Sequence, residues 1–328
     1  MTERRLMLLD TAALYFRAFY GLPDTLRSPD GVPVNAVRGL LDMIARLVAD
    51  YRPTDLIACW DDDWRPQWRV DLIPTYKTHR VAEVVDVGPD VEIVPDPLEV
   101  QVPVIREALT ALGIPIVGTP GYEADDIIGT LAATATTPVD VVTGDRDLFQ
   151  VIDDARGVRV IYTARGMSNL EVVTDEVLRG KYGISAGQYA DYATLRGDSS
   201  DGLPGVAGIG EKTATTLLRE YGDLAGIVAA ADGGPSVKLS PSVKAKIRAG
   251  ADYLARAPQV VAVARDLDLP AVDSRVGIPP GGVEEITRLG TRWGLGESVS
   301  RVIASLGERD SGPRPVGTGP LPESTGSP

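Results

Sequence analysis

The stretch "GYEADDIIGT" (residues 121–130) places three carboxylates, Glu123, Asp125 and Asp126, within four positions at the start of a predicted helix. An apolar run follows them, which gives the helix one side to bury in a core. Acids in a first helical turn have an ordinary explanation, because the free N–H groups and the helix dipole favour negative charge. A functional interpretation therefore depends on whether carboxylates from elsewhere in the chain converge on the same place.

The bulk composition limits the class of protein. The chain has 328 residues, of which 44% are hydrophobic, enough for one large core or two smaller ones. No apolar run approaches the roughly 20 residues that span a bilayer, and the N-terminus lacks a secretory signal, so we expect no membrane partner and a cytoplasmic location. The single Cys59 allows no internal disulfide, and the single His79 supports no histidine-based metal site. The net charge of −13 argues against nucleic-acid binding unless many acids serve bound cations.

Strands alternate with helices along the first half of the chain. Apolar strands are predicted at residues 4–10, 54–61, 114–121, 139–143 and 158–162, with helical segments among them. This alternation predicts the α/β class, with a mainly parallel central sheet flanked by helices. From about residue 171 the pattern is typical of short helices, and the Pro-, Gly- and Ser-rich end is predicted to be disordered. We therefore expect an α/β core at 1–170, a helical region at 171–308 and a tail at 309–328.

Three of the predicted strands run into aspartates. Asp10 ends the first strand, Asp61 ends the second, and Asp145 and Asp147 follow the strand at 139–143. The carboxyl ends of parallel strands lie at one edge of a sheet, so these acids should share a site with the acidic helix. Two like charges about 4 Å apart repel by ~4 kcal/mol at an effective dielectric near 20, so either some carboxylates are protonated or cations lie among them. Oxygen ligands favour Mg²⁺ or Mn²⁺, and two such ions can assist phosphoryl displacement.

A second motif lies in the helical region. The stretch "RGDSSDGLPGVAGIGEKTATTLL" (residues 196–218) has closely spaced glycines before a helix that starts at about Glu211, and no strand precedes it. It therefore predicts a helix-hairpin-helix and not a Rossmann loop; a plain glycine-rich turn between helices is the alternative. Backbone N–H groups and nearby side chains would meet a phosphate at Gly205, Gly208, Gly210, Lys212 and Thr213. Upstream, Asp198 and Asp201 could join the acidic site if the helical region folds back.

Together these motifs resemble the bacterial 5′-nuclease family, which comprises flap endonucleases and the 5′→3′ exonuclease domain of DNA polymerase I. The resemblance covers roughly residues 4–265, through "LLDTAALYFRAFY", "WDDDWRPQWRVDLIPTYKTHR", "GYEADDIIGTLA", "VTGDRDLFQVI", "KYG" and "GDSSDGLPGVAGIGEKTA". It implies a stand-alone nuclease that hydrolyses DNA phosphodiesters at 5′ flaps, nicks and the 5′ ends of duplexes, in replication and repair. It also implies a two-metal mechanism with two or more Mg²⁺ or Mn²⁺ ions.

The resemblance assigns roles to particular positions. The family's metal-site acids match Asp10, Asp61, Glu123, Asp125, Asp126, Asp145, Asp147, Asp198 and Asp201. Its basic pair near the scissile phosphate matches Lys77 and Arg80, and a further basic position matches Arg69. Its DNA-binding hairpin, an H3TH-type motif, matches Gly205, Gly208, Ile209, Gly210, Lys212 and Thr213. The family's hairpin also binds K⁺ through backbone carbonyls, for which the matching residues are Val206 and Ile209.

Three features depart from the family pattern. Gly202 stands where the family usually has asparagine, which is expected to loosen that turn. Asp62 and Asp63 add charge beside the site. Residues 81–100, where relatives form an arch over the 5′ strand, are acidic, contain proline and lack Lys and Arg, so we expect an irregular loop that does not clamp a strand.

Two other functions were weighed against the nuclease. The chain could be a structure-specific DNA-binding protein with little catalysis, although the complete acid set argues against an inactive member. It could also be a phosphatase with an aspartate nucleophile, but "LLDTAA" lacks the second acid that such enzymes carry after the first strand.

Overall fold

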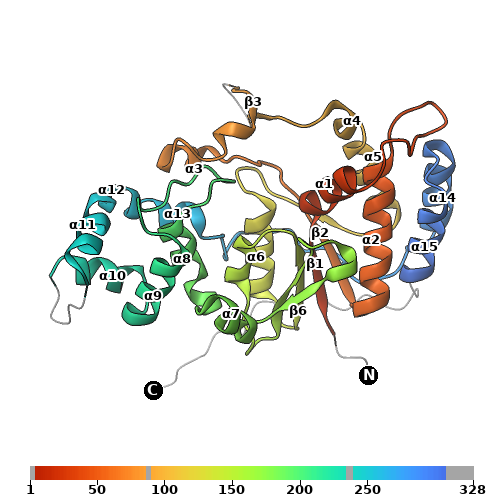
Figure 1. Ribbon diagram of the computed structural model, residues 1–328. Coiled ribbons are helices and arrows are strands. Elements are labelled where there is room, and N and C mark those ends of the chain that lie inside the picture. The colour runs from red at the N-terminus through yellow and green to blue at the C-terminus, as the bar shows by residue number, and fades with distance from the viewer. Residues whose placement is uncertain (1–3, 86–89, 234–238, 308–328) are drawn as a thin grey trace, which may run out of the picture.

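A six-stranded sheet forms the centre of the molecule (Figure 1). The computed structural model describes residues 4–85, 90–233 and 239–307. The strand order is β5-β2-β1-β6-β7-β8, and all neighbouring pairs are parallel except β7 and β8. The strands are β1 (Leu6–Asp10), β2 (Asp55–Cys59), β5 (Ile116–Val117), β6 (Val139–Thr143), β7 (Val158–Tyr162) and β8 (Glu171–Val173). The prediction of a mainly parallel sheet flanked by helices is confirmed; β8 was not predicted.

The side chains of β1 divide the interior into two cores. Because successive side chains of a strand point to opposite faces, Met7 and Leu9 lie in one core and Leu8 in the other. The first core is covered by α1 (Thr11–Gly21), α2 (Asn35–Tyr51) and α5 (Val102–Ala111). The second is covered by α6 (Ala124–Thr134) and the 3-10 helix η2 (Asp147–Val151), with α3 (Gln67–Leu72) beside it.

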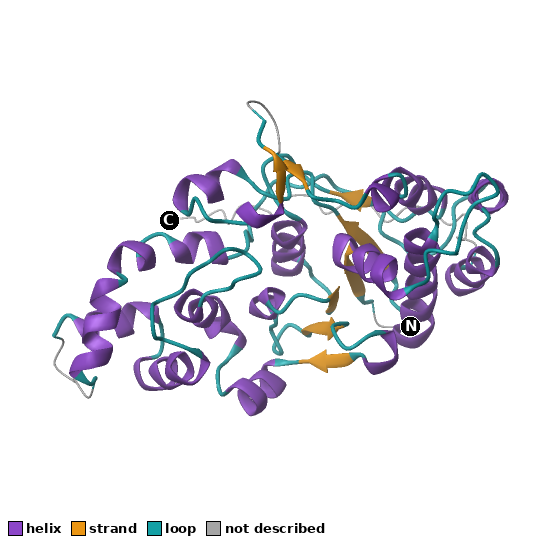
Figure 2. Cartoon of the chain, turned by 45° about the horizontal axis from the view of Figure 1, so that its top comes forward, coloured by secondary structure: helices purple, strands orange, loops and turns teal. Residues whose placement is uncertain are grey.

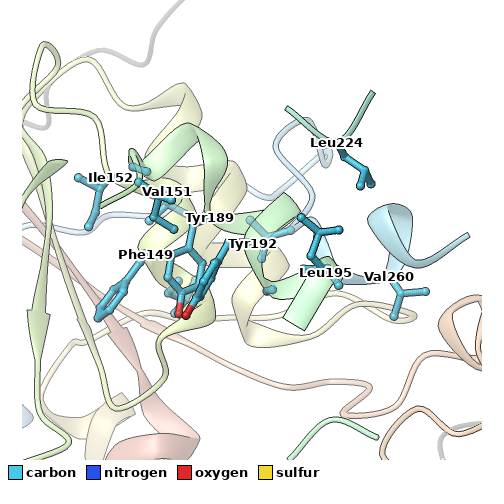
Figure 3. Packing of buried hydrophobic residues seen from close by; sticks show 14 of the residues in the cluster. Phe149, Val151, Ile152, Tyr189, Tyr192, Leu195, Leu224 and Val260 are labelled. Carbon is cyan, nitrogen blue, oxygen red and sulfur yellow. The ribbon is translucent and has the colours of Figure 1, made fainter. Parts of the chain in front are cut away.

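Aromatic side chains join the helical region to the second core. The ring of Phe149 in η2 meets Tyr162 edge-on at a centroid distance of 5.2 Å and Tyr189 at 5.4 Å. Tyr192 packs beside Tyr189 (Figure 3). The 3-10 helix η3 (Met167–Asn169) precedes β8. The helices of the helical region are α7 (Asp175–Tyr182), η4 (Ala186–Gln188), α8 (Tyr189–Arg196), α9 (Glu211–Tyr221), α10 (Leu224–Ala231), α11 (Pro241–Ala249), α12 (Ala251–Leu254) and α13 (Ala257–Val261). This shared core holds the hairpin at a fixed place relative to the sheet.

The last two helices do not belong with the helical region. The helices α14 (Gly282–Trp293) and α15 (Glu297–Leu306) pack on α5 and α2, beside the first core (Figure 1). The expected division into 1–170 and 171–308 stays a prediction; in the structure β8 completes the sheet and α15 packs on α2. The predicted tail at 309–328 lies outside the described residues. Within the described ranges, no helix combines the length and the apolarity that a bilayer crossing needs.

The acidic segment 81–100 is more regular than expected. After the 3-10 helix η1 (Thr78–Arg80), strands β3 (Val81–Glu83) and β4 (Val91–Glu92) pair antiparallel, and the short α4 (Asp96–Glu99) follows. Figure 2 shows this β3–β4 hairpin projecting from the body. Asp90 anchors it, since its carbonyl accepts from Trp64 Nε1 at 2.7 Å and its carboxylate pairs with Arg65. The expectation of an irregular loop is wrong for these residues; residues 86–89 lie outside the described part.

Candidate active site

The register of the sheet brings acids from different strands together. Asp10 pairs with Cys59, two positions before Asp61, and Leu9 pairs with Val142, three positions before Asp145. These strand ends and the N-terminus of α6 border a cleft of about 600 Å³. Six of the nine predicted acids line it: Asp10, Asp61, Glu123, Asp125, Asp145 and Asp198.

Short hydrogen bonds hold the acids at the strand ends. Asp10 caps α1 by accepting from the Ala13 amide at 3.2 Å, and its other oxygen accepts from Thr143 Oγ1 at 2.6 Å. Asp61 accepts from the amide of Ala124 at 2.9 Å, which ties β2 to the start of α6. The positions of these carboxylates are therefore fixed by the same contacts that start the helices.

Crowding and burial disturb the protonation of the cleft acids. Burial raises the pKa of Asp10 to about 7, and the negative charge of Asp61 adds to that rise. Burial also raises the pKa of Asp125 well above its ordinary value, followed by repulsion from Asp10 and Asp145. The protein alone supplies too little positive charge here, so the cleft favours a cation.

Two further predicted acids, Asp147 and Asp201, do not line the cleft but lie close enough to Asp145 for its charge to add to burial in raising the pKa of both. Burial, and then the charges of Asp145 and Asp201, raise the pKa of Asp147 well above its usual range. One oxygen of Asp147, Oδ1, is buried without a hydrogen-bond partner. Within the described ranges, no three His, Cys, Asp or Glu side chains form a ready-made metal cage. An ion in this cleft would therefore complete its coordination with water and substrate oxygens, as Mg²⁺ commonly does.

The structure gives Asp126 and Arg69 a different place from the predicted one. Arg69 is 2% exposed, and its Nη1 and Nη2 each lie 2.8 Å from an oxygen of Asp126. Arg69 also contacts Glu123 at 3.0 Å and donates to the carbonyl of Val260 at 3.1 Å. Asp126 has no exposed surface, and one of its oxygens also accepts from the Ala264 amide at 2.8 Å. These two side chains form a buried ion pair that joins α3, α6 and the segment after α13, outside the cleft.

Lys77 and Arg80, the predicted basic pair, both line the cleft. The ammonium of Lys77 contacts the carboxylate of Glu123, which also accepts from Tyr76 Oη at 2.7 Å. Burial alone would raise the pKa of Glu123, but the charges of Lys77 and Arg69, with hydrogen bonds from Lys77 and Tyr76, together outweigh it and hold that pKa below its ordinary value. Arg80 donates to the carbonyl of Ser200 at 3.0 Å. Glu123 thus faces a buried cation directly, and the cleft acid Asp198 is likewise paired with Arg196 at 2.9 Å.

The loop before the hairpin folds back onto the segment that carries Lys77. The amide of Lys77 donates to the carbonyl of Asp201 at 3.0 Å, and Thr75 Oγ1 donates to the carbonyl of Gly202 at 2.7 Å. Gly202 has φ +69°, and a Cβ there would lie 2.0 Å from the carbonyl oxygen of Thr75. The expectation that Gly202 loosens the turn is therefore wrong, because only glycine permits this contact.

The predicted hairpin connects α8 to α9. Gly205 and Gly208 adopt left-handed φ values of +65° and +76°, and Gly210 caps α9 without a side-chain hydrogen bond. The side chains of Val206 and Ile209 are buried, so these residues can offer only backbone groups to a ligand. The hairpin therefore presents backbone and a helix N-terminus outward, the arrangement that suits a phosphate.

Around the hairpin, Lys212 and Thr213 occupy the first turn of α9, where Lys212 is exposed and Thr213 half-buried. Sequence reasoning missed Lys246 on α11, whose ammonium donates to the carbonyl of Gly208 at 3.0 Å. No local sequence pattern could predict this contact, because 38 positions separate Lys246 from Gly208.

Sequence reasoning also missed part of the cleft wall. Phe16, Arg17 and Tyr20 of α1 line it, together with Glu92 of β4 and Arg146. The spacing of Phe16 and Tyr20 by four positions in "LLDTAALYFRAFY" could have indicated one helical face. Neither Asp62 nor Asp63 lines the cleft.

Comparisons with known proteins identify the family of this chain. Residues 5–183 match the family model of the 5′-3′ exonuclease N-terminal resolvase-like domain, and residues 184–278 match that of the 5′-3′ exonuclease C-terminal SAM fold. A 5′-3′ exonuclease of Streptomyces coelicolor is 58% identical over 300 residues, covering 92% of this chain and 99% of that protein. A 5′-3′ exonuclease of Mycobacterium tuberculosis is 46% identical over 310 residues, covering 92% and 97%.

Solved structures share the fold at low sequence identity. The T5 D15 protein co-crystallised with metal ions matches with a TM-score of 0.59 and 18% identity, over 92% of this chain and 99% of that one. The catalytic core of Rad2 in complex with DNA substrate matches with a TM-score of 0.56 and 17% identity, over 92% of both chains. The family models and the extensive identity to full-length relatives show that this chain belongs to the 5′-3′ exonuclease family.

Proposed function

We propose that this chain is a structure-specific 5′-nuclease that hydrolyses DNA phosphodiesters at 5′ flaps, nicks and the 5′ ends of duplexes, in replication and repair. The observation that carries the proposal is one cleft in which acids from β1, β2, β6 and α6 meet Lys77 and Arg80. Membership of the 5′-3′ exonuclease family supports cleavage that starts from the 5′ end of a strand.

Two or more Mg²⁺ or Mn²⁺ ions belong to this proposal. The donor set fits hard cations, since its acids offer only oxygens, the pKa values of Asp10, Asp125 and Asp147 are raised, and one buried carboxylate oxygen of Asp147 has no partner. The ligands would come from Asp10, Asp61, Glu123, Asp125, Asp145, Asp147, Asp198 and Asp201. Asp126 is left out because Arg69 occupies its carboxylate. Bound ions would supply Lewis-acid polarisation of the phosphodiester and activation of water.

The cations of the cleft would act on the substrate phosphate. Lys77 and Arg80 line the same cleft as the acids, so both can approach a phosphodiester that enters it. Their positive charges would stabilise the negative charge that develops on the phosphate during hydrolysis. Arg69 would act indirectly as a positioning residue, because it holds Glu123 in the place where Lys77 meets it.

The hairpin would hold the duplex beside the cut. A second hollow of about 640 Å³ shares Arg146, Asp198 and Ser200 with the cleft and extends along the loop to Pro204. A DNA backbone can follow it to the N-terminus of α9 and Lys212. K⁺ bound by the carbonyls of Val206 and Ile209 is part of this proposal. Lys246 already brings a positive charge to the same turn, at Gly208.

The test is a product-size map with an end-labelled 5′ flap, a nicked duplex and a blunt duplex, each with Mg²⁺ and with Mn²⁺. The proposal predicts metal-dependent cleavage at the junction or the 5′ end. Binding of these substrates without cleavage in either metal would instead support the alternative of a DNA-binding protein with little catalysis.

A further inference from the structure

A separate hollow of about 390 Å³ adjoins the acid cleft, between α1 and the β3–β4 hairpin. Its lining consists of Phe16, His79, Arg80, Glu92 and Ile93. Three of these, Phe16, Arg80 and Glu92, also line the cleft, so the two spaces share a wall. Any group bound in this hollow would therefore lie next to a phosphate in the cleft.

The walls of the hollow combine a flat apolar surface with polar groups. The ring of Phe16 is stacked with Tyr15 at a centroid distance of 5.2 Å and with Tyr20 at 6.4 Å, which fixes its orientation. Ile93, which is 58% exposed, adds a solvent-accessible apolar side chain to the lining. Arg80 is held by the carbonyl of Ser200. A ligand with an aromatic face and a polar edge suits such walls, and a nucleobase has both.

The carboxylate of Glu92 selects which part of a nucleotide can face it. A phosphate would be repelled by Glu92, whereas an exocyclic amino group of a base could donate a hydrogen bond to it. Adenine, cytosine and guanine carry such amino groups, while thymine presents a carbonyl oxygen at the corresponding position. The hollow therefore suits the base and not the backbone of a nucleotide.

The position of the hollow determines which nucleotide can reach it. The hollow that leads to the DNA-binding hairpin meets the cleft at Arg146, Asp198 and Ser200, whereas this one meets it at Phe16, Arg80 and Glu92. If the duplex lies on the hairpin side, the nucleotide 5′ of the scissile phosphate lies on the other side.

We propose that this hollow is a base-binding pocket for the nucleotide on the 5′ side of the scissile phosphate, with Phe16 as its stacking surface and Glu92 as the acceptor for an amino group of the base. The proposal rests on the nuclease function proposed above and adds to it a preference at one position. It also gives the β3–β4 hairpin a direct part in substrate recognition.

The experiment measures kcat/KM on nicked duplexes whose 5′-terminal nucleotide carries adenine, cytosine, thymine or no base. Loss of the base should slow the wild type by about tenfold, the usual order for one stacking contact. Thymine should be cleaved more slowly than adenine or cytosine. Phe16→Ala and Phe16→Leu should both lower the rate on the intact base and abolish the effect of removing it; Leu keeps apolar volume in case Ala perturbs folding.

Glu92→Gln should remove the discrimination against thymine, because an amide can donate as well as accept, while keeping the penalty for a missing base. Val84→Ala is the matched control on the same hairpin, since Val84 is 73% exposed and does not line the hollow. It should behave as the wild type on all four substrates.

A binding measurement keeps this proposal separable from the nuclease function. With Ca²⁺ in place of Mg²⁺, a 2-aminopurine at the 5′ terminus should be quenched when the wild type binds and remain bright with Phe16→Leu. Two results would overturn the pocket alone. One is equal cleavage rates on substrates with and without the 5′-terminal base; the other is quenching of 2-aminopurine fluorescence by the Phe16→Leu variant as strong as by the wild type. Quenching without any cleavage in Mg²⁺ or Mn²⁺ would support the pocket and overturn the nuclease.

Discussion

Asp125 and Asp126 are neighbours in the first turn of α6, yet their surroundings are opposite. Asp125 lines the cleft, where other acids repel it and its pKa is raised. Asp126 is fully buried and held by both outer nitrogens of Arg69. Successive side chains of a helix point about 100° apart, so one acid faces the sheet edge and the other faces α3. Of these two neighbours, Asp125, which faces other acids, is available to a ligand, whereas Asp126, which is paired with Arg69, stabilises the fold.

The largest expected effect is on catalysis. Asp125→Asn should lower kcat by at least about 10²–10³-fold at saturating Mg²⁺, the order seen when one group that stabilises transition-state charge is removed. Duplex binding should stay close to that of the wild type, because the hairpin holds the DNA. The measurement is single-turnover cleavage of a labelled nicked duplex, with binding followed separately by anisotropy.

Asp126→Asn is the matched control for this prediction. It should retain the cleavage rate at a temperature where the protein remains folded. If Asp126→Asn abolished cleavage in a folded protein while Asp125→Asn spared it, the assignment of the two acids would be reversed.

The next effect is on stability. Arg69→Met should destabilise the protein by roughly 3–5 kcal/mol, because it leaves the buried carboxylate of Asp126 without its cation. The double variant Arg69→Met/Asp126→Leu should lose less than the sum of the single changes. Denaturant unfolding in EDTA measures both quantities. A single variant as stable as the wild type would show that the ion pair contributes nothing to the fold.

The metal-free protein should respond to pH in a direction set by its cleft acids. The folded pKa of Asp10 is raised to about 7 from an ordinary value of 3.8, so the folded state keeps a proton that the unfolded state loses between these values. Stability in EDTA should therefore fall as pH rises from about 4 to 7. Asp125→Asn should reduce this fall, since it removes a neighbouring charge.

Divalent ions should offset the same repulsion. At 100 times Kd, each ion should stabilise the folded state by about 2.7 kcal/mol at pH 7.5. Melting curves at pH 5 and pH 7.5, with and without Mg²⁺, measure both effects. A melting temperature that EDTA leaves unchanged at pH 7.5 would contradict a metal site in this cleft.

The smallest effect concerns the hairpin. Lys212 is exposed at the start of α9, so Lys212→Ala should weaken DNA binding and reduce the slope of log K against log salt by about one unit, with kcat unchanged. Lys77→Met should instead lower kcat with little change in binding. Lys181→Ala is a control, because its ammonium is already paired with Glu171 at 3.0 Å. If Lys212→Ala lowered kcat and Lys77→Met weakened binding instead, the duplex would lie on the side of the cleft opposite to the hairpin.

Local sequence patterns predicted the parallel part of the sheet and the edge at which its acids meet. Alternating strands and helices are local patterns, and parallel strands deliver their final residues to one edge, so Asp10, Asp61 and Asp145 had to converge. The glycines before Glu211 likewise determined the hairpin, because positive φ values favour glycine and the helix follows at once.

The pairing of charges depends instead on contacts between residues that are distant in the chain. Arg69 lies 57 positions from Asp126, and Thr75 lies 127 positions from Gly202, so no local pattern could predict either contact. The β3–β4 hairpin is a further example, because its acidic sequence suggested a loop, yet its Glu92 lines the cleft. So is α15, which lies near the end of the described chain but packs on α2 near its start. The physical reason is that charge pairing and core packing depend on which surfaces meet after folding, whereas strand and helix patterns depend on neighbours in the chain.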